Sequence, residues 1–204
     1  FNWQFTEQWD AAFGLRREKF ESSNGYFDND DANTAIFDLT QIPSRSSSET
    51  SPKFSLGYQP NADWSLRYSV AKAYRFPIVE ELFSQYEAYN SISVSNPILA
   101  PEDGLHHNLM VERAIPNGYI RVNYFTETIE NAIESQSTIL NGGTSLRTFI
   151  PVDELETSGL EFIANAQSMF LPELDIRFNT VYTDSEVVKN AANTSLGGNV
   201  YPRM

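Results

Sequence analysis

The feature that most constrains this chain is an alternation of apolar and polar residues with a period of two. In the range 64–71 the odd positions are small or charged, and the even positions are large or apolar: Trp64, Leu66, Tyr68 and Val70. Successive side chains of a β-strand point to opposite faces, so such a segment forms a strand with one apolar and one polar face. The alternation recurs in the ranges 9–16, 54–58, 105–112, 120–124, 160–167 and 174–182. The sequence therefore predicts an all-β chain of about seven strands, with the end of one more at residues 1–5.

The connections between these strands alternate in length. The short ones contain Pro, Asn, Asp or Gly and read as turns: 59–63, 116–118 and 171–173. The long ones are polar and rich in Ser, Asn and Gly: about 21–50, 74–104 and 134–157. Outer-membrane barrels have short periplasmic turns and long extracellular loops, and strands of roughly 9–11 residues span the bilayer. We therefore predict an antiparallel up-and-down transmembrane β-barrel segment whose apolar face meets lipid.

Composition limits the partners and the chemistry. The 204 residues include 14 Lys and Arg against 27 Asp and Glu, which gives a net charge of −13. This acidic balance argues against nucleic acid as a partner, because phosphate binding requires clustered cations. The chain has no Cys, so disulfides, thiolate metal sites and a cysteine nucleophile are excluded. It also has no run of more than three apolar residues, whereas a membrane helix needs roughly 20.

The sequence predicts neither an enzyme nor a metal site. His106 and His107 are adjacent, so on a strand they point to opposite faces and cannot share a metal ion. Glu80 and Glu81 are neighbours at the exit of a strand, where we expect a loop cap rather than a glycosidase acid/base pair. Nucleophile-elbow, P-loop and dinucleotide-binding motifs are all absent from the sequence. We predict no catalytic residue, no metal ligand and no cofactor.

Several segments resemble the barrel of TonB-dependent outer-membrane receptors. Residues 72–83 read K-A-Y-R-F-P-I-V-E-E-L-F, similar to the family's K-A-[FY]-R-x-P-x-x-x-E-L-[FY], and residues 96–102 read N-P-I-L-A-P-E, similar to N-P-x-L-x-P-E. Residues 156–161 resemble the R-x-x-G-[VL]-E element without its Arg. Residues 13–16 resemble the G-L-R strand, and residues 201–204 resemble a later Pro-Arg stretch. These segments follow the family's order over nearly the whole chain.

The resemblance implies the C-terminal portion of a 22-stranded barrel whose lumen is blocked by a plug domain. We expect residues 1–204 to be a partial receptor barrel domain, with the plug domain and the final strands lying outside this chain. The resemblance further implies a location in the cell outer membrane, in contact with its lipid. The implied function is import of a ferric siderophore or another small nutrient, energised by TonB through an N-terminal segment that this chain lacks.

The long loops supply the candidate ligand contacts, because aromatic rings and guanidinium groups suit anionic ferric complexes. These candidates are Tyr26, Arg45, Tyr86, Tyr89 and Arg147. The motif residues have structural interpretations instead. Pro77 removes a backbone donor and ends a strand, while Asn96 and Glu102 are placed to hydrogen-bond backbone N–H groups and fix the base of the loop.

Two alternatives stay open on the residues alone. A passive porin or adhesin barrel shares the strand pattern but lacks the two Pro-containing motifs. A soluble carbohydrate-binding β-sandwich also has alternating strands, with its apolar face packed inward.

Overall fold

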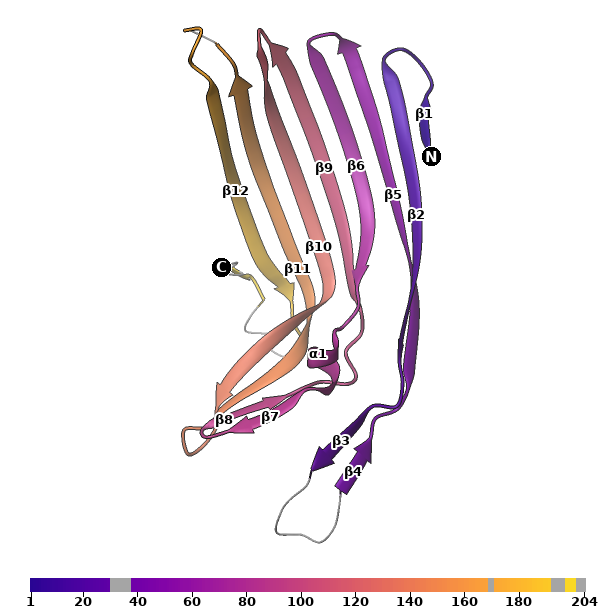
Figure 1. The fold of residues 1–204 in the computed structure, drawn as a ribbon, viewed down its shortest axis with the longest axis vertical. Helices are drawn as coiled ribbons and strands as arrows, with labels where there is room; N and C mark the ends of the chain where they lie inside the picture. Colours follow the sequence, from indigo (N-terminus) through magenta and orange to yellow (C-terminus); the bar gives the residue numbers. More distant parts are fainter. Residues whose placement is uncertain (30–37, 169–170, 192–196, 201–204) are drawn as a thin grey trace.

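The computed structural model describes residues 1–29, 38–168, 171–191 and 197–200, so the resemblance at 201–204 lies outside the described residues. In the described part, most of the chain belongs to one large sheet (Figure 1). Its long strands are β2 (Trp9–Ser22), β5 (Arg45–Asn61), β6 (Trp64–Arg75), β9 (Glu102–Ile115), β10 (Gly118–Ile139), β11 (Ser145–Ala166) and β12 (Ile176–Lys189). The short strand β1 (Asn2–Gln4) pairs with β2, and β13 (Asn199–Val200) pairs with β12.

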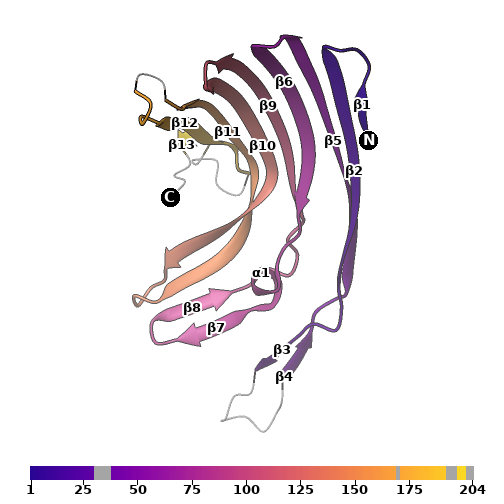
Figure 2. The same ribbon diagram turned by 45° about the horizontal axis from the view of Figure 1, so that its top comes forward.

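The strands follow one another across the sheet in chain order, and each consecutive pair of long strands is antiparallel. Figure 2 shows that the sheet curls into a half-barrel, with β2 and β12 toward opposite ends of the arc. The prediction of an all-β, up-and-down arrangement with about seven long strands is confirmed. No helix in the described part of the chain is long and apolar enough to cross a membrane.

The register separates the two faces of the sheet. Residues paired across neighbouring strands share a face, and one such row runs through Leu56, Tyr68, Leu109, Tyr124, Leu160 and Tyr182. We call this face the apolar face and the opposite one the polar face. The apolar face is open: Tyr124 is 50% exposed and Leu160 is 49% exposed. A soluble sandwich would pack this face against a second sheet, but the other sheet of the described residues is only a two-stranded hairpin.

The predicted long loops are shorter than expected, because strands extend into them. The first contains the hairpin of β3 (Tyr26–Asn29) and β4 (Asp38–Gln41), and the second contains α1 (Val79–Phe83), β7 (Gln85–Ala88) and β8 (Ser91–Val94). The third prediction, a loop over 134–157, is wrong: β10 and β11 stay paired as far as Ile139 and Ser145. The predicted length of 9–11 residues is also too short, since the long strands have 12 to 22 residues. Where both faces of a strand meet water, the alternation disappears although the backbone ladder continues.

The extended end of β10 and β11 forms a small core with the second loop. Leu82 of α1, Leu99, Ile133 and Phe149 are buried together, with Phe20 and Phe83 packed against them. The β10 backbone bends nearby at Asn131, whose φ is 56°. β8 runs parallel to β11, with Ser91 beside Ser145 and Val94 beside Thr148. The loop between β6 and β9 is therefore built into the sheet instead of hanging free.

On the polar face, Gly57 leaves room for an ion pair that spans two strands. Arg67 Nη2 donates to Asp10 Oδ1 at 2.9 Å, and Gly57 lies between them in the register. A Cβ atom at Gly57 would lie only 2.3 Å from Asp10 Oδ1. The pair exists because this position has no side chain.

We expect Gly57→Ala to push Asp10 and Arg67 apart and to lower the free energy of unfolding by about 1–3 kcal/mol. Urea unfolding of the refolded protein in detergent micelles measures this loss. In an Asp10→Ala background the same substitution is expected to cost much less, because no pair remains to be broken. Equal losses in both backgrounds would contradict this role of Gly57.

Candidate functional site

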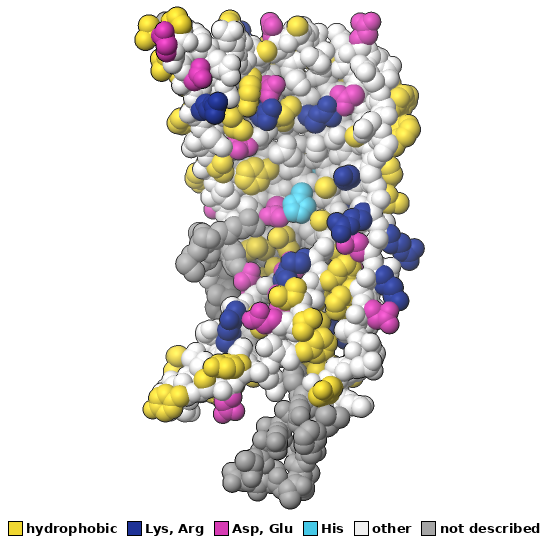
Figure 3. All heavy atoms as spheres, in the orientation of Figure 1, with side chains coloured by type: hydrophobic (Ala, Val, Ile, Leu, Met, Phe, Trp, Pro, Cys, Tyr) yellow, Lys and Arg dark blue, Asp and Glu magenta, His cyan; other side chains and the backbone are white. Residues whose placement is uncertain are grey.

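The polar face is crossed by hydrogen-bonded charged groups from neighbouring strands. Arg121 of β10 donates to Glu112 of β9 through Nε at 2.8 Å, and Asn123 donates to Glu161 of β11 at 2.6 Å. His106 Nδ1 lies 3.1 Å from Glu127 Oε1. Figure 3 shows side chains of both signs mixed over this face. The polar face is thus a wall whose charges are largely paired within the sheet.

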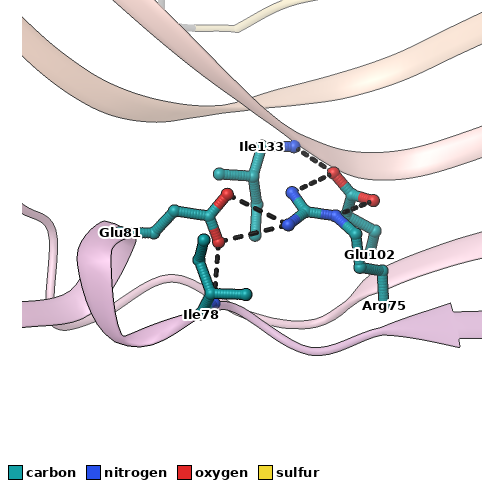
Figure 4. Close-up of polar contacts among 5 residues, drawn as sticks. All are labelled: Arg75, Ile78, Glu81, Glu102 and Ile133. Carbon is teal, nitrogen blue, oxygen red and sulfur yellow. Dashed lines mark hydrogen bonds and ion pairs between the residues drawn. The ribbon is translucent and has the colours of Figure 1, made fainter.

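The end of the sheet that carries the long connections is organised by Arg75, the last residue of β6 (Figure 4). Its guanidinium binds both oxygens of Glu102, the first residue of β9, from Nε at 2.7 Å and from Nη2 at 2.8 Å. Its Nη1 reaches both oxygens of Glu81 in α1, at 3.0 and 3.2 Å. One side chain therefore joins the two ends of the loop 76–101 to the helix inside it.

The two carboxylates also bind backbone donors. Glu81 Oε2 accepts the N–H of Ile78 at 2.9 Å, which caps the start of α1. Glu102 Oε1 accepts the N–H of Ile133 in β10 at 2.7 Å, next to the bend of that strand. Glu81 is only 7% exposed, so its charge depends on these partners. We call Arg75, Glu81 and Glu102, with the Ile78 and Ile133 amides, the loop-base network.

The loop-base network lies beyond the apolar band of the sheet. On the apolar face, that band gives way at this level to an ion pair between Lys72 and Asp103, 2.8 Å apart. The hydrogen bonds from Arg75 to Glu102 raise the pKa of the guanidinium above its ordinary value; burial opposes this shift, and the bonds to Glu81 add to it. The cation is therefore permanent, and the network acts as a structural anchor.

A second anchor confirms the interpretation of the N-P-I-L-A-P-E segment. Asn96 donates through Nδ2 to the carbonyl oxygen of Phe149 at 3.1 Å, and its Oδ1 accepts the N–H of Ile98 at 3.2 Å. Arg45 at the start of β5 donates to the carbonyl oxygens of Pro97 and Leu99. The structure thus gives Arg45 a structural role, and a ligand contact by this residue stays a prediction.

The other ligand candidates lie in exposed positions of the long connections. Tyr26 in β3 is 59% exposed, Tyr86 in β7 is 62% exposed, and Tyr89 in the β7–β8 turn is 95% exposed. Arg147 in β11 is exposed, with its guanidinium 5.3 Å from the centre of the Phe149 ring. The structure brings Tyr86, Tyr89 and Arg147 to one region, since β8 pairs with β11 and Ser145 N–H donates to the Asn90 carbonyl. Tyr26 belongs to a separate hairpin.

The histidines lie as the alternation predicts. His106 is on the polar face beside Glu127, whereas His107 is on the apolar face, where Nδ1 is 2.7 Å from the hydroxyl of Tyr68. Within the described ranges, no group of three or more His, Asp or Glu side chains is arranged to hold a metal ion.

Sequence reasoning missed the convergence of Arg75, Glu81 and Glu102 on one point. It recognised the segments that contain them, but it could not show that the ends of a 26-residue loop meet (76–101). The available signal was an Arg at the end of one strand, an acid at the start of the next, and a second acid in the loop between them.

We expect Glu81→Ala to destabilise the loop by about 1–3 kcal/mol, because it removes two Arg75 contacts and the cap of Ile78. Hydrogen exchange of the α1 and β7–β8 amides measures this local opening. Glu80→Ala is the matched control: the adjacent, exposed Glu80 should change stability by less than about 0.5 kcal/mol. Similar exchange rates in the two variants would show that the network does not hold the loop.

Comparisons with known proteins agree with this geometry. The family model described as TonB dependent receptor-like, beta-barrel matches residues 1–204. A search by sequence among curated proteins finds no match. Among solved structures, the chain resembles the copper transporter OprC with a TM-score of 0.72 and 14% identity, over 92% of this chain and 28% of OprC.

Two further solved structures show the same fold. The FrpB iron transporter from Neisseria meningitidis (F5-1 variant) has a TM-score of 0.62 and 17% identity, over 95% of this chain and 26% of FrpB. The hemophore receptor HasR of Serratia marcescens, in complex with its hemophore HasA and heme, has a TM-score of 0.55 and 14% identity, over 87% of this chain and 30% of HasR. The chain therefore spans between a quarter and a third of the length of these proteins. Because the family model covers every residue and the fold agrees, this chain belongs to the β-barrel family of TonB-dependent receptors.

Proposed function

We propose that this chain is part of an outer-membrane receptor that actively imports a ferric siderophore or a similar small nutrient, with energy delivered through TonB. The observation that carries the proposal is the family match over residues 1–204. Proteins of the same fold are described as a copper transporter, an iron transporter and a hemophore receptor. We further propose that a plug domain, a TonB-contacting segment and more barrel strands belong to the same receptor.

The apolar face supports a place in the outer membrane, where members of this family are barrels. At the end of the sheet that carries the short turns, Trp9 stacks on Tyr58 with ring centres 4.3 Å apart, and Arg113 lies over Trp64 at 5.3 Å. Aromatic and basic side chains of this kind suit the boundary between lipid and water. At the other end, the Lys72–Asp103 ion pair marks the return to water.

The anchored loop supports a receptor function. Binding costs less when the binding surface is already ordered. The loop-base network, the Asn96 contacts and the parallel β8–β11 ladder hold the loop 76–101 against β10 and β11. Exposed Tyr86 and Tyr89 are therefore presented on a fixed support at the end of the lumen that faces the medium in this family's topology.

The decisive test is uptake. In the source bacterium, deletion of the gene that encodes this chain should abolish accumulation of one radiolabelled substrate among ferric siderophores, heme and copper. The same uptake should stop when TonB is removed or when a protonophore collapses the inner-membrane gradient. A passive porin lets its solute move down a gradient, so uptake that survives the protonophore would contradict active import.

The orientation of the faces has its own test. We expect Leu109→Arg on the apolar face to reduce the free energy of folding into lipid vesicles by about 2–4 kcal/mol, as for cations facing lipid. Asn108→Arg, one residue away on the polar face, should cost far less. Denaturant titration of the vesicle-inserted protein compares the two. A larger loss for Asn108→Arg would place lipid on the other side of the sheet.

A further inference from the structure

The β7–β8 hairpin extends the sheet beyond β11 and brings two distant residues onto one row. Tyr86 pairs with Ser93, Ser93 pairs with Arg147, and Arg147 pairs with Ser137 of β10. Residues paired directly across neighbouring strands have side chains on the same face. Tyr86 and Arg147 are therefore on one face of this small sheet, on either side of Ser93. We call these residues the Tyr86–Arg147 row.

The row has the width of a small planar group. Neighbouring strands lie about 4.8 Å apart, so the backbones of Tyr86 and Arg147 are separated by about 10 Å. Between them stands only the short hydroxymethyl group of Ser93. The next row on this face consists of Ala88, Ser91, Ser145 and Ile139, so Ser hydroxyls continue the floor. Tyr86 is 62% exposed and Ile139 is 69% exposed, and both are open to a ligand.

The charge on this face is the opposite of the charge on the chain. The whole chain has a net charge of −13. On the strand positions that share the face of the Tyr86–Arg147 row there is no carboxylate, and the nearby acids Glu87 and Glu134 occupy the alternate positions that point to the other face. In the part of the chain that the structure describes, Arg147 forms no ion pair; its guanidinium lies over the Phe149 ring. The face thus offers one uncompensated cation.

We propose that the Tyr86–Arg147 row binds a ligand that carries a planar aromatic ring bearing anionic oxygens, such as a catecholate chelate of iron. The ring stacks on Tyr86. The anionic oxygens accept hydrogen bonds from the Arg147 guanidinium, whose planar fork suits paired oxygens. The Ser93 hydroxyl donates between the two contacts. This inference rests on the proposed import function for the supply of ligand, and it names the chemistry that the receptor selects.

Binding of two probes to the full-length receptor in detergent tests the proposal. The first is the iron(III) complex of 2,3-dihydroxybenzoate, which is aromatic and anionic. The second is the uncharged iron(III) acetohydroxamate complex, which has no ring. Arg147→Gln removes the cation, whereas Ser93→Phe leaves both side chains in place and fills the space between them. We expect each variant to weaken binding of the first probe about ten-fold and to leave the second unchanged.

The matched control is Glu87→Gln, which removes a charge from the same hairpin on the opposite face. Its affinity for the first probe should stay within about two-fold of the parent, since exposed charges on the far side contribute little. Far-UV circular dichroism and the melting temperature verify folding. If Arg147→Gln does not fold, Ser93→Phe and the partial rescue expected of Arg147→Lys decide the question.

Parent-like affinity of Arg147→Gln and Ser93→Phe for the dihydroxybenzoate complex would overturn the proposal, and so would equal weakening for both probes. Failure of the import function is separate. Uptake that resists the protonophore would contradict active transport while leaving selective binding at the row intact.

Discussion

The arrangement of the loop end depends on one guanidinium. Arg75 binds Glu102 with two donors and Glu81 with a third, and these carboxylates in turn accept the N–H groups of Ile133 and Ile78. Two acids near each other in a protein would repel, and a carboxylate that is 7% exposed would lose its hydration without return. Charge-assisted hydrogen bonds to one planar cation solve both problems. The loop, its helix and the bend of β10 are consequently fixed to the same point.

The anchored loop changes what the rest of the sheet can do. With α1 packed on Ile133 and Phe149, the chain beyond it is directed toward the edge of β11, where β8 adds a parallel strand. That strand covers backbone groups that β11 would otherwise expose. It also carries Tyr86 and Tyr89 to the neighbourhood of Arg147, so a surface assembled from two separate loops becomes one continuous face.

Much of this could be predicted from the sequence. The period-two pattern placed Tyr68, Leu109 and Tyr124 on one face and Arg67, Glu112 and Arg121 on the other, and the register confirms both sets. The extensions of β10 and β11 could not be predicted in this way, because strands wetted on both faces carry no alternation. The five-residue α1 also has too few residues to show a helical period. Of the candidate ligand residues, Arg45 forms contacts that are structural, and the contacts of Tyr26, Tyr86, Tyr89 and Arg147 with a ligand stay predictions.

By itself, the sequence determined the strand faces, the short turns and the family, because these follow from side-chain alternation and from residues close together in the chain. Tertiary structure decided which distant residues meet. The contact of Arg75 with Glu102, the parallel pairing of Ser93 with Arg147, and the passage of Arg67 over Gly57 to Asp10 all close loops of many residues. The free energy of closing such a loop is set by everything that packs at its ends, and no local pattern in the sequence encodes that sum.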